Sequence, residues 1–380
     1  MKRQWAVIFA IWWISRLAPA GAGATVEPPL ETPPVDSLLL RLSVASELLG
    51  YSGEYVHQTR HAGRELYLKY FIQHWPPDKT VIRFLEPDSL RQTVIAMNGS
   101  RVRARGDHHV RRMARHLRPG RWLRKRFALR EIDLLKRNYA VSVEPGPVML
   151  GRPTYRVHIR PIRSGRPELR LWVDQASFFI LKMQRLSPVA SGKELHEYTR
   201  IEFTTPDTAE FRRIWASLDT LADARSHRKE RSRKIYTRLV DALAEHDGAI
   251  LVPQQVPEGF ELTRIRKFTA RERTYMHFLY TDGLAFISLF EYPKTMSKEN
   301  GARETRKRRR TDLSVVNGRV GDIGYHLVSE IPRDELERMA QSLMPIQRVK
   351  KQSIPPYYWW ASLAVVAALL FWWQRRRERK

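Results

Sequence analysis

The histidines are the residues best suited to metal chemistry in this sequence, because it contains no cysteine. His108 and His109 are adjacent, and adjacent residues on a strand point to opposite faces of the sheet. No clustered carboxylate lies near this pair to complete a ligand set. His57 and His61 could meet only where a strand bends. The sequence therefore predicts no metal and no cofactor, and the lack of cysteine also excludes disulfides and thiolate sites.

No residue pattern typical of an enzyme occurs in the chain. There is no His-Glu-x-x-His pair, no Gly-x-Ser-x-Gly elbow, and no glycine-rich phosphate loop followed by lysine. The glutamates Glu54, Glu65 and Glu86 show no paired spacing, which a polysaccharide hydrolase would need. Trp172 and Asp174 share a strand face, where a structural role is favoured. We therefore predict a protein that is not an enzyme.

A basic stretch over residues 101–137 is the strongest candidate for binding an anionic partner. Arginines are interleaved with apolar residues there, and the whole chain of 380 residues carries a formal net charge of +27. Clustered arginine neutralises phosphate groups, which nucleic acids and anionic lipids both carry. A basic loop near a membrane without a specific ligand is the alternative. The anionic-surface candidates are Arg111, Arg112, Arg115 and Arg124.

The two ends of the chain predict its location. Residues 1–24 have the basic start, apolar core and small-residue end of a signal peptide, although Arg16 leaves an uncleaved anchor as the alternative. Residues 357–373 carry no charge and have aromatic residues at both edges, as a single transmembrane helix does. The basic tail 374–380 indicates a cytoplasmic C-terminus. We therefore expect a single-pass membrane protein whose bulk lies outside the cytosol, where nucleic acid is not the expected partner.

The hydrophobic pattern predicts a first α+β unit. A helix over 36–49, with Asp36 as its N-cap and Gly50 at its end, precedes four strands with period-two alternation. Asn98-Gly99 marks a hairpin turn among these strands. Four further short strands, separated by turn residues, form an antiparallel meander between residues 139 and 203. Together these elements predict a curved antiparallel sheet with a helix packed on it.

A second α+β unit follows a charged connector. The connector over 206–250 has helical periodicity. The unit over 251–344 begins with two strands joined by a turn at Thr281-Asp282-Gly283. A further strand is expected over 315–331, and Pro332 marks the start of a helix. The chain therefore has two folded units between its predicted signal peptide and membrane helix.

Both units resemble the MucB/RseB family of periplasmic regulators of anti-sigma factors. In the first unit the matching segments are LLGYSGEYV and LGRPTYRVHIRPIRSGRPELRLWVDQASFFILKMQRL, and in the second they are VPEGFEL, YTDGLAFISLF and YHLVSEIPRDELERMAQSL. The family's Gly-Arg-Pro, Leu-Trp-(Val/Leu)-Asp and strand lysine correspond to Gly151-Arg152-Pro153, Leu171-Trp172-Val173-Asp174 and Lys182. The resemblance covers residues 36–205 and 251–344.

The resemblance implies an α+β fold with two domains. The first is expected to be a curved antiparallel half-barrel with helices in its concavity around an apolar cleft, as in lipoprotein carriers. The second is expected to be a smaller α/β domain. Which face is concave depends on register, since a shift of one residue inverts the choice, and core packing is the alternative role for any cleft residue. The lipid-cleft candidates are Tyr55, Tyr67, Tyr70, Val81 and Phe84.

The resemblance also implies a function. It predicts a periplasmic sensor, anchored here in the inner membrane, that regulates an anti-sigma factor in extracytoplasmic stress signalling. The expected partners are an anti-sigma-factor-like membrane protein and the acyl chains of lipids or lipopolysaccharide, while a homo-oligomer stays open. A lipid or lipoprotein carrier tethered to the inner membrane is the alternative. Because family members are expected to be soluble, the C-terminal anchor and the long connector are departures that bear on the partner's identity.

Overall fold

The structure, a computed structural model, describes residues 32–61, 64–106, 129–189, 193–218, 233–246, 248–270, 273–293 and 313–347. Several predicted features lie outside these residues: the signal peptide 1–24, the transmembrane helix 357–373, the tail 374–380, His108-His109, and Arg111, Arg112, Arg115 and Arg124. Among the described residues, no helix is both long enough and apolar enough to cross a membrane.

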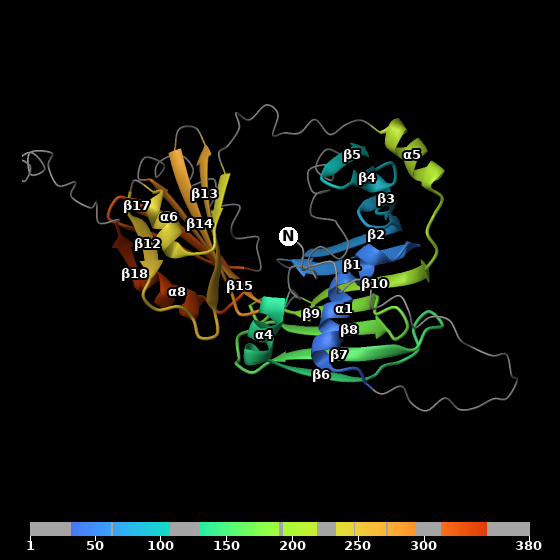
Figure 1. Cartoon of the computed structure of the whole chain (residues 1–380), viewed down its shortest axis with the longest axis horizontal. Coiled ribbons are helices and arrows are strands. Elements are labelled where there is room, and N and C mark those ends of the chain that lie inside the picture. The colour runs from blue at the N-terminus through green and yellow to red at the C-terminus, as the bar shows by residue number, and fades with distance from the viewer. Residues whose placement is uncertain are drawn as a thin grey trace, which may run out of the picture. The chain divides into compact units, whose positions relative to one another are not determined.

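A ten-stranded antiparallel sheet dominates the first half of the chain (Figure 1). The strand order is β5-β4-β3-β2-β1-β10-β9-β8-β7-β6, so β1 and β10 pair in the middle although they are far apart in sequence. The predicted meander of residues 139–203 is thus half of this sheet. Its strands are β1 (Tyr51–His61), β2 (Arg64–Trp75), β3 (Lys79–Glu86), β4 (Val94–Asn98), β5 (Arg101–Arg105), β6 (Tyr139–Pro145), β7 (Thr154–Pro161), β8 (Glu168–Asp174), β9 (Ile180–Leu186) and β10 (Lys193–Glu202).

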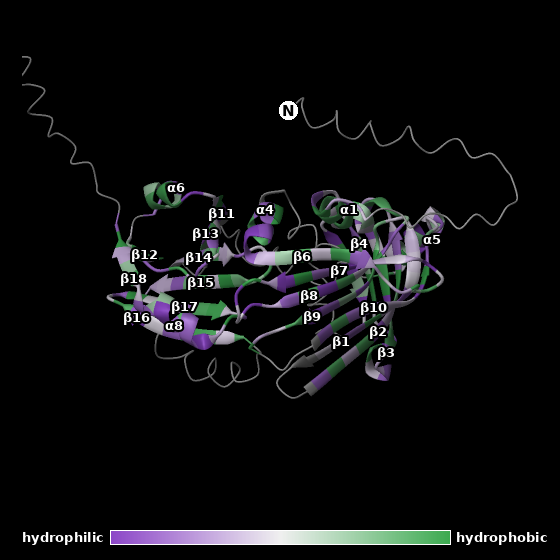
Figure 2. Cartoon of the chain, turned by 90° about the horizontal axis from the view of Figure 1, so that it is seen from below, coloured by the Kyte–Doolittle hydropathy of each residue, from purple (hydrophilic) through white to green (hydrophobic). Residues whose placement is uncertain are grey.

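Helices cover both faces of this sheet. Helix α1 (Val35–Leu48) packs Leu38, Leu39 and Leu42 against one face, here called the α1 face, and α4 (Leu129–Asn138) packs beside α1. Helix α5 (Thr208–Ser217) covers part of the other face, the α5 face, and a short helix, η2 (Asp88–Leu90), follows β3. Figure 2 shows hydrophobic and hydrophilic residues alternating along the strands, as period-two side-chain placement requires.

The start and end of α1 differ from the prediction. Pro34, not Asp36, is the N-cap residue, and Asp36 instead lies in the first turn, where it pairs with Lys136 at 2.8 Å. The helix ends at Leu48, and Gly50 lies beyond it in close contact with Thr205. A Cβ at Gly50 would lie 2.3 Å from Thr205 Oγ1, so glycine is needed there for close approach rather than for capping.

The second half of the chain forms two smaller antiparallel sheets. The six-stranded sheet has the order β11-β13-β14-β15-β17-β16, and β12 pairs with β18. The expected α/β domain is therefore built from antiparallel hairpins, which need no helical crossovers. Its strands are β11 (Arg233–Tyr236), β12 (Ile250–Pro253), β13 (Glu261–Ala270), β14 (Arg273–Thr281), β15 (Phe286–Pro293), β16 (Ser314–Val320), β17 (Ile323–Ser329) and β18 (Leu343–Ile346), and its helices are α6 (Leu239–Ala244) and α8 (Arg333–Gln341).

Two local predictions in this half were wrong. The single strand expected over 315–331 is the hairpin of β16 and β17, because Gly321 adopts a positive φ of 55° and reverses the chain. The connector 206–250 is not helical throughout, since β11 joins the edge of the six-stranded sheet by pairing with β13. The predicted turn at Thr281-Asp282-Gly283 and the helix after Pro332 are confirmed.

Contacts between the two halves include hydrogen bonds at the end of α4. Both sheets belong to one unit, Pro34–Lys380. The Asn138 side-chain amide donates to the backbone oxygens of Gly259 and Asp282, each at 3.0 Å. The Tyr139 hydroxyl donates to the buried Asp282 carboxylate at 2.9 Å. Buried polar groups of the first domain are thus satisfied by groups of the second.

Candidate functional site

The α1 face brings together three of the five predicted cleft residues. Tyr55 and Tyr70 are direct cross-strand partners on β1 and β2, and Phe84 on β3 is the partner of Tyr70. The ring centroids lie 5.1 Å apart for Tyr55–Tyr70 and 5.7 Å apart for Tyr70–Phe84. The other two residues lie on the α5 face: Val81 is buried near Phe211 of α5, and Tyr67 is 41% exposed. The register divides the predicted set between two faces.

Further aromatic side chains extend this group on the α1 face. The rings of Tyr51 and Phe179 lie 4.8 Å apart, and those of Tyr55 and Tyr198 lie 4.7 Å apart in an edge-to-face arrangement. Burial raises the pKa of the Tyr70 and Tyr198 hydroxyls above its ordinary value, because a buried phenolate would lose its solvation. We call Tyr51, Tyr55, Tyr70, Phe84, Phe179 and Tyr198 the aromatic cluster. Sequence analysis missed Tyr198, whose only signal is its alternation with polar neighbours on β10.

Two histidines and a glutamate lie at one edge of the aromatic cluster. His57 on β1 and His196 on β10 are cross-strand partners whose rings stack at 4.2 Å with an interplanar angle of 14°. Glu194 Oε1 lies 2.8 Å from His196 Nε2 and 3.5 Å from His57 Nε2. The pKa of Glu194 is held far below its ordinary value by these imidazoles, against the opposing effect of burial. We call these three residues the seam triad, because they lie where β1 meets β10.

The orientation of the seam triad is fixed by a tyrosine of the aromatic cluster. The Tyr55 hydroxyl lies 2.8 Å from His196 Nδ1, on the ring nitrogen opposite to the one that faces Glu194. The two histidine side chains are 18% and 16% exposed, and that of Glu194 is 38% exposed. The sequence pointed to His57 and His61 as a pair that needs a bend, whereas the structure places His196 beside His57 by strand pairing. The signal available in the sequence was the alternation of Glu194 and His196.

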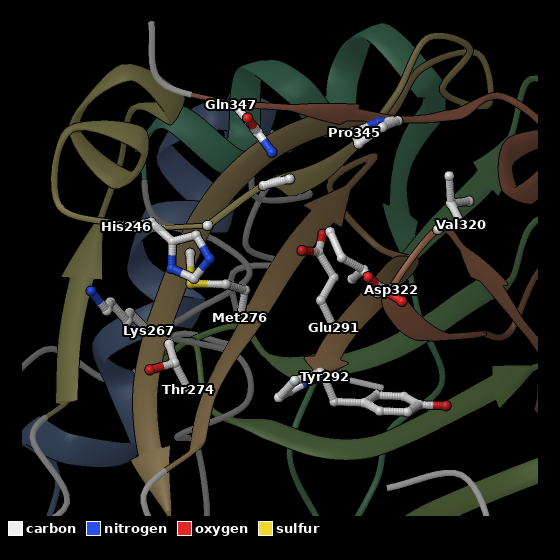
Figure 3. A pocket seen from close by; sticks show the side chains of 15 residues that line it. His246, Lys267, Thr274, Met276, Glu291, Tyr292, Val320, Asp322, Pro345 and Gln347 are labelled. Atoms are coloured by element: carbon white, nitrogen blue, oxygen red, sulfur yellow. The ribbon is translucent and has the colours of Figure 1, made fainter. Parts of the chain in front are cut away.

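A cavity of about 640 Å³ lies in the second half of the chain (Figure 3). Glu291 of β15 lines it together with Met276 of β14. Glu291 is 3% exposed; its Oε2 accepts a hydrogen bond from the Leu251 backbone N–H at 3.2 Å, and its Oε1 has no hydrogen-bond partner among the described residues. Burial raises the pKa of Glu291 to about 8. Such a cavity could take a small polar molecule beside a carboxyl group that is largely protonated at neutral pH.

The residues that carry the family resemblance have structural roles. Asp174 is 1% exposed and accepts hydrogen bonds from Arg152 Nε at 2.9 Å and from the Ser177 backbone N–H at 2.9 Å. Lys182 lies over the Trp172 ring at 5.4 Å and pairs with Glu197 at 3.0 Å. These contacts tie β8 to its neighbouring turn and to β9. The Asp174 carboxylate and the Lys182 ammonium group are both engaged in ion pairs.

Two family models match the chain, in the order of its two sheets. The model described as the MucB/RseB N-terminal domain matches residues 34–217. The model described as the MucB/RseB C-terminal domain matches residues 249–344. No curated protein matches the sequence.

Two solved structures share the fold, and a third is similar over part of the chain. The crystal structure of MucB in complex with MucA(peri) is 16% identical, with a TM-score of 0.50, and the match covers 83% of this chain and 100% of that chain. The complex structure of Pseudomonas aeruginosa MucA/MucB is also 16% identical at a TM-score of 0.50, with 82% and 99% covered. A LolA superfamily protein from Nitrosomonas europaea is 11% identical at a TM-score of 0.26, with 47% and 98% covered.

Proposed function

The chain belongs to the MucB/RseB family, and from this membership we propose that it regulates an anti-sigma factor by binding that factor's periplasmic part. Proteins of this family are regulators rather than enzymes. The observation that carries the proposal is the presence of both family domains, in order, over residues 34–217 and 249–344. The MucB structures of the same fold are complexes with MucA, which supports a protein partner of that kind.

The partner is tested directly with purified proteins. The chain is titrated calorimetrically with the periplasmic segment of each membrane-bound anti-sigma factor encoded in the same genome. We expect saturable binding of one of them, and slower proteolysis of that segment in the complex. An absence of binding to all of them would remove the regulatory proposal.

We further propose that the aromatic cluster receives an acyl chain of a lipid or lipopolysaccharide. Tyr70 and Phe84 are 5% and 2% exposed, whereas Tyr55 on the neighbouring strand is only half-buried, which supports entry of an apolar chain beside Tyr55. An acyl chain gains about 0.8 kcal/mol for each methylene group that it buries on such a surface. Occupancy would then be sensed as a change in how the chain binds its protein partner.

A pair of tyrosines on opposite faces tests the lipid proposal. Tyr55→Ala removes a ring from the aromatic cluster, while Tyr67→Ala removes a 41% exposed ring from the α5 face of the neighbouring strand. We expect Tyr55→Ala to weaken binding of a fluorescent fatty acid about 10-fold, and Tyr67→Ala to leave it unchanged. Mass spectrometry of extracted ligands checks the wild type. Equal effects of both substitutions, or no bound lipid in either assay, would contradict the proposal.

The location of the protein completes the proposal. The apolar segment 357–373 would anchor it in the inner membrane, with residues 25–354 in the periplasm. Arg111, Arg112, Arg115 and Arg124 would face anionic headgroups, so vesicle binding should weaken as salt rises.

A tethered carrier remains the competing function. A lipid-transfer assay between two vesicle populations separates them, because a regulator should move no cargo.

A further inference from the structure

The seam triad has the donor set of a metal site. We propose that His57, Glu194 and His196 bind a divalent transition-metal ion of the zinc type at the junction of β1 and β10. Two imidazoles and one carboxylate, with a fourth position left for water, form a common zinc ligand set. Imidazole ligands also suit copper and nickel. Within the part of the chain that the structure describes, this is the one group of three such side chains whose ligand atoms converge.

The distances between the ligand atoms suit an ion once the two imidazole rings rotate. The three ligand atoms all lie within 4.8 Å of one another. Zinc lies about 2.0–2.1 Å from imidazole nitrogen and from carboxylate oxygen, so tetrahedral ligand atoms are about 3.3 Å apart. Glu194 Oε1 lies 2.8 Å from one histidine nitrogen and 3.5 Å from the other, which brackets that value. Because the rings are nearly parallel, both must rotate substantially about their side-chain bonds before the Nε2 lone pairs, which lie in the ring planes, point at one ion.

Each imidazole would offer its Nε2 atom to a metal. In the metal-free protein His196 Nε2 contacts the Glu194 carboxylate at 2.8 Å, and a metal ion would replace that hydrogen bond. The Tyr55 hydroxyl would then accept from His196 Nδ1–H, which leaves the Nε2 lone pair for the ion. His57 Nε2 is buried and has no hydrogen-bond partner among the described residues, although it lies 3.5 Å from the Glu194 carboxylate. A buried polar atom without a partner costs free energy, and a metal bond would remove that cost.

The charges around the site favour a cation. Arg185 is the cross-strand partner of Glu194, but its guanidinium pairs with Glu330. The triad therefore presents one carboxylate charge and two imidazole lone pairs to an ion.

His158, a histidine of the same sheet outside the seam triad, also lies beside a carboxylate but, within the described residues, lacks a second imidazole. His158 lies on β7 with its Nε2 2.7 Å from Glu168, and Arg170 Nη2 lies 2.7 Å from the same carboxylate. There the cation position is filled by a guanidinium, so no ion is expected. His158 is thus a matched control of equal exposure, 16%, in the same sheet.

The test is a metal titration of the full-length untagged chain after treatment with EDTA. We expect isothermal titration with Zn²⁺ to give one tight site per chain. The double variant His57→Ala/His196→Ala should lower the affinity at least 100-fold, and Tyr55→Phe should lower it about 10-fold, since it removes the group that orients His196. His158→Ala and the double variant His108→Ala/His109→Ala should bind as the wild type does.

Two further measurements keep the test decisive. Circular dichroism and thermal unfolding in EDTA establish that each variant is folded, and His57→Asn/His196→Gln replaces the alanine variant if it is not. The visible spectrum of bound Co²⁺ should indicate four ligands in the wild type and change in Glu194→Gln. Absence of a tight site, or zinc affinity that persists without His57 and His196, would overturn the proposal. The metal proposal rests on a different site from the proposed function. Neither the Zn²⁺ titration nor the Co²⁺ spectrum depends on lipid or on a protein partner, so a failure of one proposal leaves the other intact.

Discussion

Glu291 shows how one buried side chain makes stability depend on pH. Burial raises its pKa from an ordinary 4.5 to about 8, so the folded chain keeps a proton that the unfolded chain releases. Between these two values the folded state binds more protons than the unfolded state. Stability therefore falls as pH rises from about 4.5 to about 8, by at most about 1.4 kcal/mol per pH unit.

Replacing the carboxyl group by an amide should remove this dependence. Glu291→Gln stays neutral at every pH and can still accept the hydrogen bond of the Leu251 N–H. We expect the free energy of unfolding of the variant, relative to wild type, to rise by roughly 3.5 kcal/mol between pH 5 and pH 8. Urea unfolding at both pH values measures it. The control Glu261→Gln, on a half-exposed side chain of β13, should show no such change, and a flat difference for Glu291→Gln would rule out the buried-proton explanation.

At the scale of elements, α5 is held on the sheet by its first turn. Asp207 is the N-cap residue, and its side chain accepts a hydrogen bond from the Ala209 backbone N–H at 2.9 Å. One turn later, Glu210 accepts from Arg83 Nη2 at 3.0 Å, and Phe211 packs edge-on against Trp75 at 5.2 Å. The cap, the ion pair and the aromatic contact therefore act on the same end of the helix.

Removing the cap should loosen α5 measurably. Asp207→Ala leaves the Ala209 N–H without its side-chain acceptor and should cost about 1 kcal/mol of unfolding free energy. Arg212→Ala, on the exposed side of the same helix, should cost less than about 0.5 kcal/mol. Urea unfolding followed by tryptophan fluorescence compares the two. A larger loss for Arg212→Ala than for Asp207→Ala would show that capping does not hold this helix.

At the scale of the whole molecule, two neighbouring residues of α4 link the first sheet to the second in different ways. Arg137 forms an ion pair with Glu261 at 2.6 Å, but both side chains are exposed, by 63% and 40%. Asn138 is 7% exposed and donates to backbone oxygens on both sides of the contact. Exposed ion pairs contribute about 0–1 kcal/mol, whereas an unsatisfied buried group costs about 1–3 kcal/mol.

The buried amide should therefore matter more than the ion pair. We expect Asn138→Ala to lower the free energy of unfolding by about 2 kcal/mol, because three backbone oxygens lose their donor. Arg137→Ala should lower it by less than about 1 kcal/mol. Calorimetry checks both values and shows whether the two halves unfold in separate transitions once Asn138 is replaced. The reverse ranking would mean that charge, not buried hydrogen bonding, joins the halves.

The sequence by itself determined the two α+β units and most of their strands. Period-two alternation is a local signal, so the meander between residues 139 and 203 and the hairpin turns at Asn98-Gly99 and Thr281-Asp282-Gly283 could be predicted from neighbouring residues. The family resemblance rested on such local segments and is confirmed by both family models. Local signals gave a wrong prediction where a single glycine reverses the chain. Gly321 does so, and the long strand predicted there is a hairpin.

Only the tertiary structure decided which side chains meet. Tyr55, Tyr70 and Phe84 share a face while Tyr67 and Val81 do not, because the register of three paired strands sets the face of each residue. Tyr55 and His196 are 141 residues apart and touch because β1 pairs with β10. No local pattern encodes that pairing. Long-range strand pairing brings the residues of the seam triad together, and packing between distant segments buries the carboxyl group of Glu291.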